Sequence, residues 1–425
     1  MKSIFLLSVL LASSVATPLA AKPGKVSYDE HKVFRVKSRE NFAEMQSKLH
    51  EMGLDEWHVN NIGEPFVDVM VAPDQMDEFL SLGYDTTVFV GNVADAIAEE
   101  EQPGRYNAKV ALDALPDVSS NSYFDNYHNY NDHIAFLTDL AAQFPDKAEI
   151  LSAGKTYEGR DITAIHFWGQ SKGKPAIIMQ STVHAREWVT TMVNEYIAYD
   201  LLTMYSSDAK VKSWLDKYDF YVFPFSNPDG FVYSQTNERM WRKNRMPVSS
   251  SFCQGIDINR NWPFQWNVQN GASTDPCAQD YRGTAANSAP ETKALVSFAT
   301  QLRDTTGIQM YMDWHAYAQL WMTPFGYSCD VFPQNDFRYQ QLIEGATAAV
   351  KTAGGQQYDG GRICPKIYQV SGGSVDYMDA VANTTFAFTA ELRDTGNYGF
   401  LLPANQIRPT AIESYAGIQY LLENM

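Results

Sequence analysis

Residues 176–205 read AIIMQSTVHAREWVTTMVNEYIAYDLLTMY, and this stretch decides the fold. Its first eight residues are a near-continuous apolar run, which predicts a buried strand. Residues 188–205 follow with the character of a helix. A buried strand that leads directly into a helix is typical of an α/β domain. His184 and Glu187 lie where the strand ends, which is where open α/β sheets bind their ligands.

The same alternation extends from about residue 119 to residue 425. It predicts a mixed, mostly parallel sheet sandwiched by helices, with a turn at Asn227-Pro228-Asp229-Gly230. Further strands are expected at 218–225, 308–314 and 386–391, and helices at 290–303, 336–352 and 405–424.

A smaller α+β unit precedes this domain, in residues 21–95. Short strands and helices alternate there in the order β-α-β-β-α-β of a ferredoxin-like fold. Its histidines, His31, His50 and His58, are scattered, and we expect them on the surface. Residues 96–118 contain Glu99-Glu100-Glu101 and Pro103-Gly104, a composition that predicts an exposed linker open to proteases.

Residues 1–20 have the pattern of an export signal. A positive start at Met1-Lys2 is followed by an apolar stretch that is too short to span a bilayer, and then by small residues. The chain is therefore expected to be secreted, extracellular and monomeric. Its net charge of -17 argues against nucleic acid and anionic membrane surfaces as partners.

The four cysteines form no CxxC pair, and in an exported protein an even number suggests two disulfides. Three connectivities remain open, of which sequential pairing is the simplest. The residues concerned are Cys253, Cys277, Cys329 and Cys364. Asn383 begins a candidate glycosylation sequon, Asn383-Thr384-Thr385.

A second histidine, His315, ends another predicted strand in Asp313-Trp314-His315. Together with His184 and Glu187 it offers two imidazoles and one carboxylate, which leaves a fourth zinc position open for water, as in catalytic zinc sites. H-x-x-E with a distant histidine is common, so this pattern is weak when taken alone.

Several further motifs accompany these residues in a fixed order. They are Trp241-Arg242-Lys243-Asn244-Arg245, Asn259-Arg260-Asn261-Trp262, Tyr368-Gln369-Val370-Ser371-Gly372-Gly373-Ser374, Glu391-Leu392-Arg393-Asp394-Thr395-Gly396 and Tyr398-Gly399-Phe400-Leu401-Leu402-Pro403. From about Tyr123 to the C-terminus the chain resembles the zinc carboxypeptidases of the pancreatic A/B type. For these enzymes the ligand set of two histidines and one glutamate is itself a standard example.

The resemblance implies a role for each motif. His184, Glu187 and His315 would hold one Zn²⁺, with Asp257 orienting His184. Glu391 would be the general base and Arg242 would stabilise the oxyanion. The residues that would contact the peptide substrate are Asn259 and Arg260 at its terminal carboxylate, Tyr368 closing over that end, and Tyr317 and Arg186 upstream of the bond that is cleaved.

The resemblance also locates the pocket for the departing side chain. Val375 would form its base, where relatives that release Lys or Arg carry an acidic residue, so an A-type preference for aromatic or aliphatic C-terminal residues is expected. The neighbouring Asp376 leaves a one-residue register alternative open. The other lining residues would be Gly326, Ile363, Ile367, Val370, Gly373 and Thr389.

The first unit resembles, more loosely, the propeptide of the same family. It implies an inhibitory propeptide that covers the cleft, and an activating protease that cuts between residues 101 and 119. Two alternatives remain open: a zinc amidohydrolase that acts on N-acyl amino acids, and an inactive zinc-binding homologue that only binds peptides. The substrate-binding motifs favour a peptidase, and an intact Glu391 with its zinc ligands argues against an inactive homologue.

Overall fold

The computed structural model describes residues 24–38, 41–60, 63–100, 115–249 and 251–425. The predicted export signal at residues 1–20 lies outside these ranges. Most of the predicted linker does so as well. The residues in these ranges form two sheets, one with four strands and one with eight. Among the described residues, none of the helices combines the length and apolar character needed to cross a bilayer.

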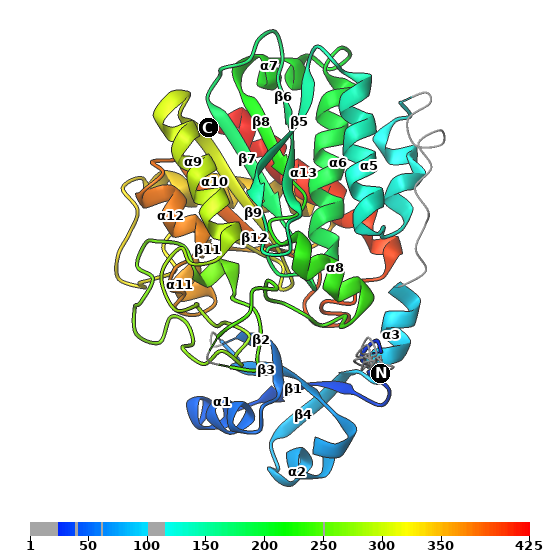
Figure 1. The fold of residues 1–425 in the computed structure, drawn as a ribbon, viewed down its shortest axis with the longest axis vertical. Helices are drawn as coiled ribbons and strands as arrows, with labels where there is room; N and C mark the ends of the chain where they lie inside the picture. Colours follow the sequence, from blue (N-terminus) through cyan, green and yellow to red (C-terminus); the bar gives the residue numbers. More distant parts are fainter. Residues whose placement is uncertain (1–23, 39–40, 61–62, 101–114, 250) are drawn as a thin grey trace, which may run out of the picture.

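The small domain has the predicted ferredoxin-like order. Its antiparallel sheet runs β2-β3-β1-β4, and its helices pack against one face of that sheet over a core that includes Val36, Leu49 and Val69. In Figure 1 these helices lie on the side away from the large domain, and β2 and β3 lie nearest to it. The elements are β1 (Lys32–Lys37), α1 (Phe42–Glu51), β2 (Asp55–Asn60), β3 (Phe66–Val71), α2 (Met76–Ser81) and β4 (Asp85–Val90).

The prediction of an exposed linker is wrong at its beginning. Residues 93–100 form the helix α3 (Val93–Glu100), whose Val93, Ile97 and Glu100 side chains are buried. Val93 and Ile97, four residues apart on one face of the helix, pack into the core of the large domain, and Glu100 pairs with Arg239; these contacts outweigh the acidic composition of the segment.

The large domain is built on a mixed sheet in the order β11-β10-β12-β9-β7-β8-β6-β5. Its four central strands, β12, β9, β7 and β8, are parallel to one another, and the outer pairs include antiparallel ones. The strands are β5 (Ala148–Lys155), β6 (Asp161–Phe167), β7 (Ala176–Ser181), β8 (Asp219–Phe223), β9 (Ile308–Ala316), β10 (Leu320–Thr323), β11 (Asp359–Arg362) and β12 (Phe386–Leu392).

Helices cover both faces of this sheet, as Figure 1 shows. Side chains of α5, α6, α10 and α13 share one apolar core, and side chains of α9 and α12 share the other. The helices are α5 (Tyr130–Gln143), α6 (Trp188–Met204), α7 (Ala209–Lys217), α8 (Pro228–Thr236), α9 (Pro290–Thr305), α10 (Asp336–Gly354), α11 (Ile363–Lys366), α12 (Ser374–Ala380) and α13 (Ile407–Asn424). The predicted α/β class is confirmed.

The turn predicted at residues 227–230 is instead the start of α8. The Asn227 side chain accepts a hydrogen bond from the Gly230 N–H, and Pro228 occupies the first turn of the helix. Asn-Pro-Asp-Gly satisfies the requirements of a helix N-terminus as well as those of a turn, and the following apolar residues favour the helix.

Both disulfides follow sequential pairing, Cys253 with Cys277 and Cys329 with Cys364. Asn383 is exposed between α12 and β12, in a left-handed conformation with φ of 52°. Its glycosylation stays a prediction.

Candidate metal centre and active site

Three candidate metal ligands meet at the carboxyl ends of two neighbouring strands. His184 and Glu187 follow β7, and His315 lies near the end of β9, which pairs in parallel with β7. The ligand atoms of the three side chains lie within 4.8 Å of one another, and all three residues are buried. The sequence prediction that these residues lie together is therefore consistent with the structure.

The donor atoms fit a zinc ion. Nδ1 of His315 lies 3.1 Å from Nδ1 of His184, and Oε1 of Glu187 lies 2.7 Å from the latter. Ligand atoms of a tetrahedral zinc site, bound at about 2.0–2.1 Å, are separated by about 3.3 Å. Burial alone would raise the pKa of Glu187, but the two imidazoles hold it below its usual value, so the carboxylate is in the form that binds a metal.

A carboxylate stands behind each imidazole. Asp257 Oδ1 lies 3.2 Å from Nε2 of His184, as the resemblance implied, and Asp313 Oδ2 lies 3.1 Å from Nε2 of His315. Such partners fix the ring so that its other nitrogen faces the metal. The role of Asp313 was missed in the sequence, although residues i and i+2 of a strand point to the same face and its spacing from His315 could have indicated it.

Arg242 and Glu391 line the same cavity, which has a volume of about 920 Å³. Arg242 Nη2 donates to Asp257 at 2.8 Å, and its Nη1 lies 3.9 Å from Glu187. Glu391 comes from β12 and pairs in register with His315 of β9. Burial raises the pKa of the Glu391 carboxyl group to about 8, against the lowering effect of His315.

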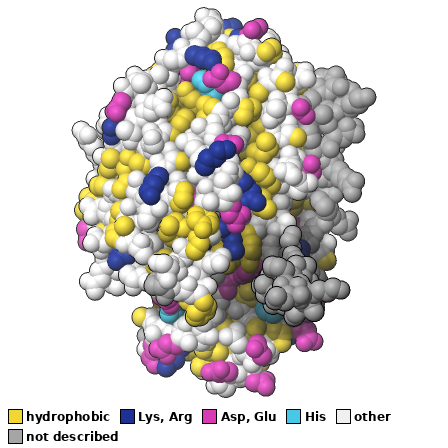
Figure 2. Space-filling model, in the orientation of Figure 1, with side chains coloured by type: hydrophobic (Ala, Val, Ile, Leu, Met, Phe, Trp, Pro, Cys, Tyr) yellow, Lys and Arg dark blue, Asp and Glu magenta, His cyan; other side chains and the backbone are white. Residues whose placement is uncertain are grey.

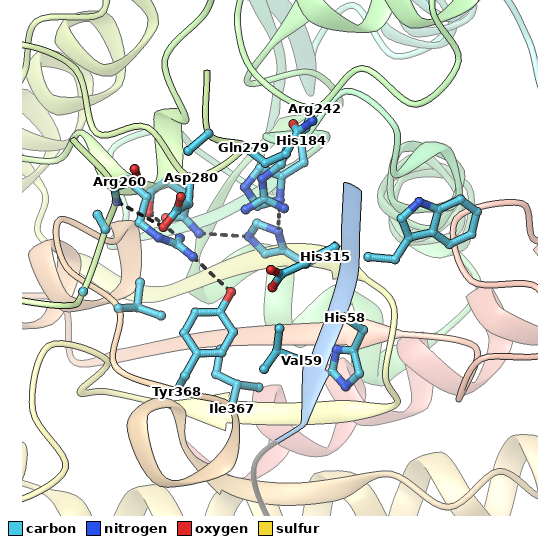
Figure 3. Close-up of a pocket in the computed structure, with 18 of the residues that line it drawn as sticks. His58, Val59, His184, Arg242, Arg260, Gln279, Asp280, His315, Ile367 and Tyr368 are labelled. Atoms are coloured by element: carbon cyan, nitrogen blue, oxygen red, sulfur yellow. Dashed lines mark hydrogen bonds between the residues drawn. The ribbon is translucent and has the colours of Figure 1, made fainter. Parts of the chain in front are cut away.

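Arg260 and Tyr368 point toward one another at one end of the cavity (Figure 3), which Asn259 also lines. Arg260 Nη2 donates to the Tyr368 hydroxyl at 3.2 Å, and the Asn259 Nδ2 atom lies 3.2 Å from His315 Nε2. Arg260 is buried, and its Nε finds no hydrogen-bond partner among the described residues. A guanidinium that lines a cavity is suited to a carboxylate ligand.

All seven residues expected in the specificity pocket line this cavity. The neighbouring Asp376 also reaches it, but its carboxylate accepts hydrogen bonds from the Gly326 N–H at 2.8 Å and the Tyr327 N–H at 2.9 Å. Burial raises the pKa of Asp376 to about 7. Its carboxyl group is thus bound by backbone N–H groups. Val375, Ile363 and Val370 provide apolar lining of the same cavity.

The two residues expected to contact the substrate upstream of the cleaved bond are occupied by the small domain. Arg186 Nη1 donates to both oxygens of Asp55 at 2.9 and 3.0 Å, and the Tyr317 hydroxyl donates to Asp68 at 3.0 Å. Asp68 is fully buried and also accepts two hydrogen bonds from Arg35, its partner on β1. The small domain therefore reaches the cleft through its carboxylates.

The surface location predicted for His58 is only partly correct, because its side chain is half-buried against the large domain. Its ring lies 5.6 Å from that of Tyr317 and 5.6 Å from that of Phe66, and Figure 3 places it on the strand that passes in front of the cavity. Burial at this interface and the nearby charge of Arg35 lower the pKa of His58 to about 4. The contact of His58 with Tyr317 was missed because no local sequence pattern indicates a contact between residues so far apart in the chain.

This fold and site define a class of hydrolase in which one divalent ion, held by two imidazoles and a carboxylate, lies beside a cationic recess. The chain belongs to the zinc carboxypeptidase family, whose family model matches residues 133–417. The resemblance inferred from the motifs is confirmed. The chain is an enzyme, a metallocarboxypeptidase, and membership of this family implies zinc as its metal.

Similar proteins span nearly the whole chain. Metallocarboxypeptidase A from Trichophyton tonsurans is 40% identical over 428 residues, and carboxypeptidase A1 from Bos taurus is 33% identical over 435 residues; each match covers 100% of this chain and 99% of the relative. Among solved structures, carboxypeptidase A from Helicoverpa armigera matches with a TM-score of 0.79 at 27% identity, over 93% of this chain and 98% of that one.

The metal centre generates a first prediction. His315→Ala removes one of three donors, so the purified protein should lose nearly all of its zinc, whereas Glu391→Gln, which leaves all three donors, should keep about one zinc per chain. Elemental analysis by mass spectrometry measures both. Equal zinc content in the two variants would contradict the ligand assignment.

The environment of His58 generates a second prediction. The folded protein, with the small domain packed on the large one, disfavours the protonated imidazole of His58. The free energy of unfolding is therefore fully retained above a pH of about 6.5, where this imidazole is neutral in both states, and it decreases as the pH falls toward 4. Between pH 6.5 and pH 4 the free energy of unfolding of the unprocessed protein should decrease by about 1–3 kcal/mol more than that of the His58→Gln variant. Thermal unfolding of both proteins as a function of pH measures this difference. His50→Gln, at an exposed position of α1, is the control, and a His58→Gln difference that is constant with pH would refute the prediction.

Proposed function

We propose that this zinc carboxypeptidase is a secreted zymogen that, once processed, releases one aromatic or aliphatic residue from the C-terminus of a peptide or protein. The observation that carries this proposal is the Arg260 guanidinium, which contacts the Tyr368 hydroxyl and lines the cavity that also holds His184, Glu187 and His315. A cationic recess next to the metal selects substrates that end in a carboxylate, and this makes the enzyme an exopeptidase.

The proposed reaction is hydrolysis of the last peptide bond. Zinc, when bound, lowers the pKa of a water molecule to about 7 and polarises the scissile carbonyl. Asn259 and Arg260 bind the terminal carboxylate, and Tyr368, 36% exposed at the mouth of the recess, closes over it. Glu391 takes a proton from the attacking water and returns it to the leaving amine.

Arg242 stabilises the negative charge that develops on the carbonyl oxygen. Its guanidinium is held in place by Asp257, which raises its pKa and leaves one edge beside Glu187 and the cavity. Asp257 also contacts His184, so a single carboxylate positions a metal ligand and the cation. An arginine fixed in this way needs no reorganisation as the charge appears, which is the general requirement for such stabilisation.

The proposed preference for aromatic and aliphatic residues rests on the apolar lining of the pocket. Val375, Ile363 and Val370 are buried there, and the carboxylate of Asp376, the residue after Val375, accepts hydrogen bonds from the backbone N–H groups of Gly326 and Tyr327. A Lys or Arg side chain entering this pocket would lose its water without gaining a free counter-ion.

The small domain is proposed to be an inhibitory propeptide. Asp55 and Asp68 occupy Arg186 and Tyr317, the residues expected to contact the upstream part of a substrate, so a peptide and the small domain compete for the same groups. An activating protease would cut between residues 101 and 119, most of which lie outside the described residues. Two disulfides, the predicted signal and the exposed sequon at Asn383 support secretion into an oxidising compartment.

A third prediction tests this function. After limited proteolysis, the protein should release C-terminal Phe from a blocked peptide faster than C-terminal Arg, on the order of 100-fold in kcat/KM. A chelator should abolish the release, and the unprocessed chain should act far more slowly on the same peptide. The two alternatives inferred from the sequence give different results: an amidohydrolase would prefer N-acyl amino acids to peptides, and an inactive homologue would release nothing.

The matched variant is Val375→Asp, which places a carboxylate beside the departing side chain and should shift the preference toward Arg. Faster release of Arg than of Phe by the unaltered enzyme would contradict the proposed pocket. Val381→Asp, outside the cavity, is the control for adding a charge in the same region of the chain.

A further inference from the structure

A buried serine links the metal centre to the cationic end of the cavity. Ser374 begins the helix α12 and is fully buried. Its hydroxyl donates to Asp313 Oδ2 at 2.5 Å, and its backbone N–H donates to Asn259 Oδ1 at 2.8 Å. Asp313 stands behind the metal ligand His315, and Asn259 lines the cavity beside it. Ser374 therefore contacts one residue of the metal centre and one residue of the substrate-binding region.

The hydroxyl of Ser374 and the imidazole of His315 share one carboxylate oxygen. Oδ2 of Asp313 lies 3.1 Å from Nε2 of His315 and 2.5 Å from Ser374 Oγ. Asp313 is fully buried, and a hydroxyl-to-carboxylate hydrogen bond of this length is of the strong, charge-assisted kind. Removal of such a donor leaves part of a buried charge unsatisfied. The Ser374 hydroxyl thus fixes the oxygen that orients the His315 ring.

The backbone N–H of Ser374 fixes the side-chain amide of Asn259. Because Asn259 Oδ1 accepts from Ser374, its Nδ2 donor points away from the serine, and it lies 3.2 Å from His315 Nε2. The Asn259 N–H also donates to Asp257 Oδ1 at 2.8 Å. These contacts use backbone groups at residues 259 and 374, so they do not depend on the hydroxyl of Ser374.

Both ends of the hydrogen bond between Ser374 and Asp313 are held by rigid elements. β9, which carries Asp313 and His315, is paired with β7 on one side and with β12 on the other. The residues that follow Ser374 in α12 pack into an apolar core, in which Val375, Tyr377 and Met378 are buried. A hydrogen bond between two fixed elements keeps a metal ligand in one orientation before the ion binds.

We propose that Ser374 is a positioning residue for the metal centre, which acts through Asp313 to hold His315 in the orientation that binds the ion. Residues that contact a metal ligand directly contribute about 10- to 100-fold to metal affinity or activity. Ser374 lies one contact further from the ion, so an effect on the order of tenfold is expected. The inference concerns the zinc site of the family, and only its kinetic consequence rests on the proposed function.

The first measurement follows the transfer of zinc from the processed enzyme to an excess of a coloured chelator. Ser374→Ala should lose zinc on the order of tenfold faster than the unaltered enzyme. Ser371→Ala is the matched control and should lose zinc at the unaltered rate. Ser371 is fully buried and lies in the same loop, but its hydroxyl donates to the Gln265 carbonyl at 2.6 Å.

A double variant tests the route through Asp313. Asp313→Ala alone and Asp313→Ala combined with Ser374→Ala should lose zinc equally fast, because the serine has no further effect once the carboxylate is absent. The comparison of the two serine variants decides the inference even where Asp313→Ala does not fold.

The second measurement distinguishes positioning of the metal from shaping of the pocket. With zinc buffered in the assay, Ser374→Ala should lower kcat for the release of C-terminal Phe at least about threefold. KM should stay within about twofold of the unaltered value, since the backbone N–H that holds Asn259 is retained.

Loss of zinc from Ser374→Ala at the unaltered rate overturns this inference, and so does equally accelerated loss from Ser371→Ala. Additive effects in the double variant overturn the route through Asp313. A raised KM with an unchanged kcat also contradicts a positioning role, since it makes Ser374 a part of the pocket wall. If none of the proteins releases Phe while the zinc rates differ as expected, the inference holds and the proposed function fails.

Discussion

The parallel pairing of β7, β9 and β12 is the constraint on which the site depends. Parallel neighbours end at the same edge of a sheet, so His184 after β7, His315 in β9 and Glu391 in β12 are brought together although more than 200 residues separate the first from the last. The strands are buried on both faces and nearly all apolar, which fixes their positions. The rigid sheet therefore sets the geometry of the metal centre.

Carboxylates also hold the cationic and hydrogen-bond-donating side chains of the cleft in position. Asp257 serves both His184 and Arg242, and the carboxylates of the small domain serve Arg186 and Tyr317. Each buried cation needs a partner, because an unpaired charge in the interior is costly. The carboxylates that meet this requirement are themselves buried or mostly buried, whereas the acidic side chains visible at the lower end of the molecule in Figure 2 face outward.

Much of the fold could be predicted because it depends on local patterns, whereas the roles of the site residues came from the resemblance of their motifs to the zinc carboxypeptidases. The apolar run before His184, the helical spacing after Glu187 and the β-α-β-β-α-β order are all properties of short segments. The contacts of His58 and Arg239 could not be predicted, since their partners lie far away in the sequence and the segments themselves carry no distinctive spacing. The exposure expected for Glu100 was wrong because composition alone predicts exposure, whereas tertiary packing against Arg239 buries this residue.

The account rests on a recess that binds the end of a chain next to one metal ion. The most direct measurement compares two peptides of identical sequence, one with a free C-terminal carboxylate and one with a C-terminal amide, by mass spectrometry after incubation with the processed enzyme. We predict that the free peptide loses its last residue and that the amide is shortened at least about 100-fold more slowly, because Arg260 then lacks its charged ligand. Equal shortening of both peptides, or cleavage at internal bonds, would contradict the account.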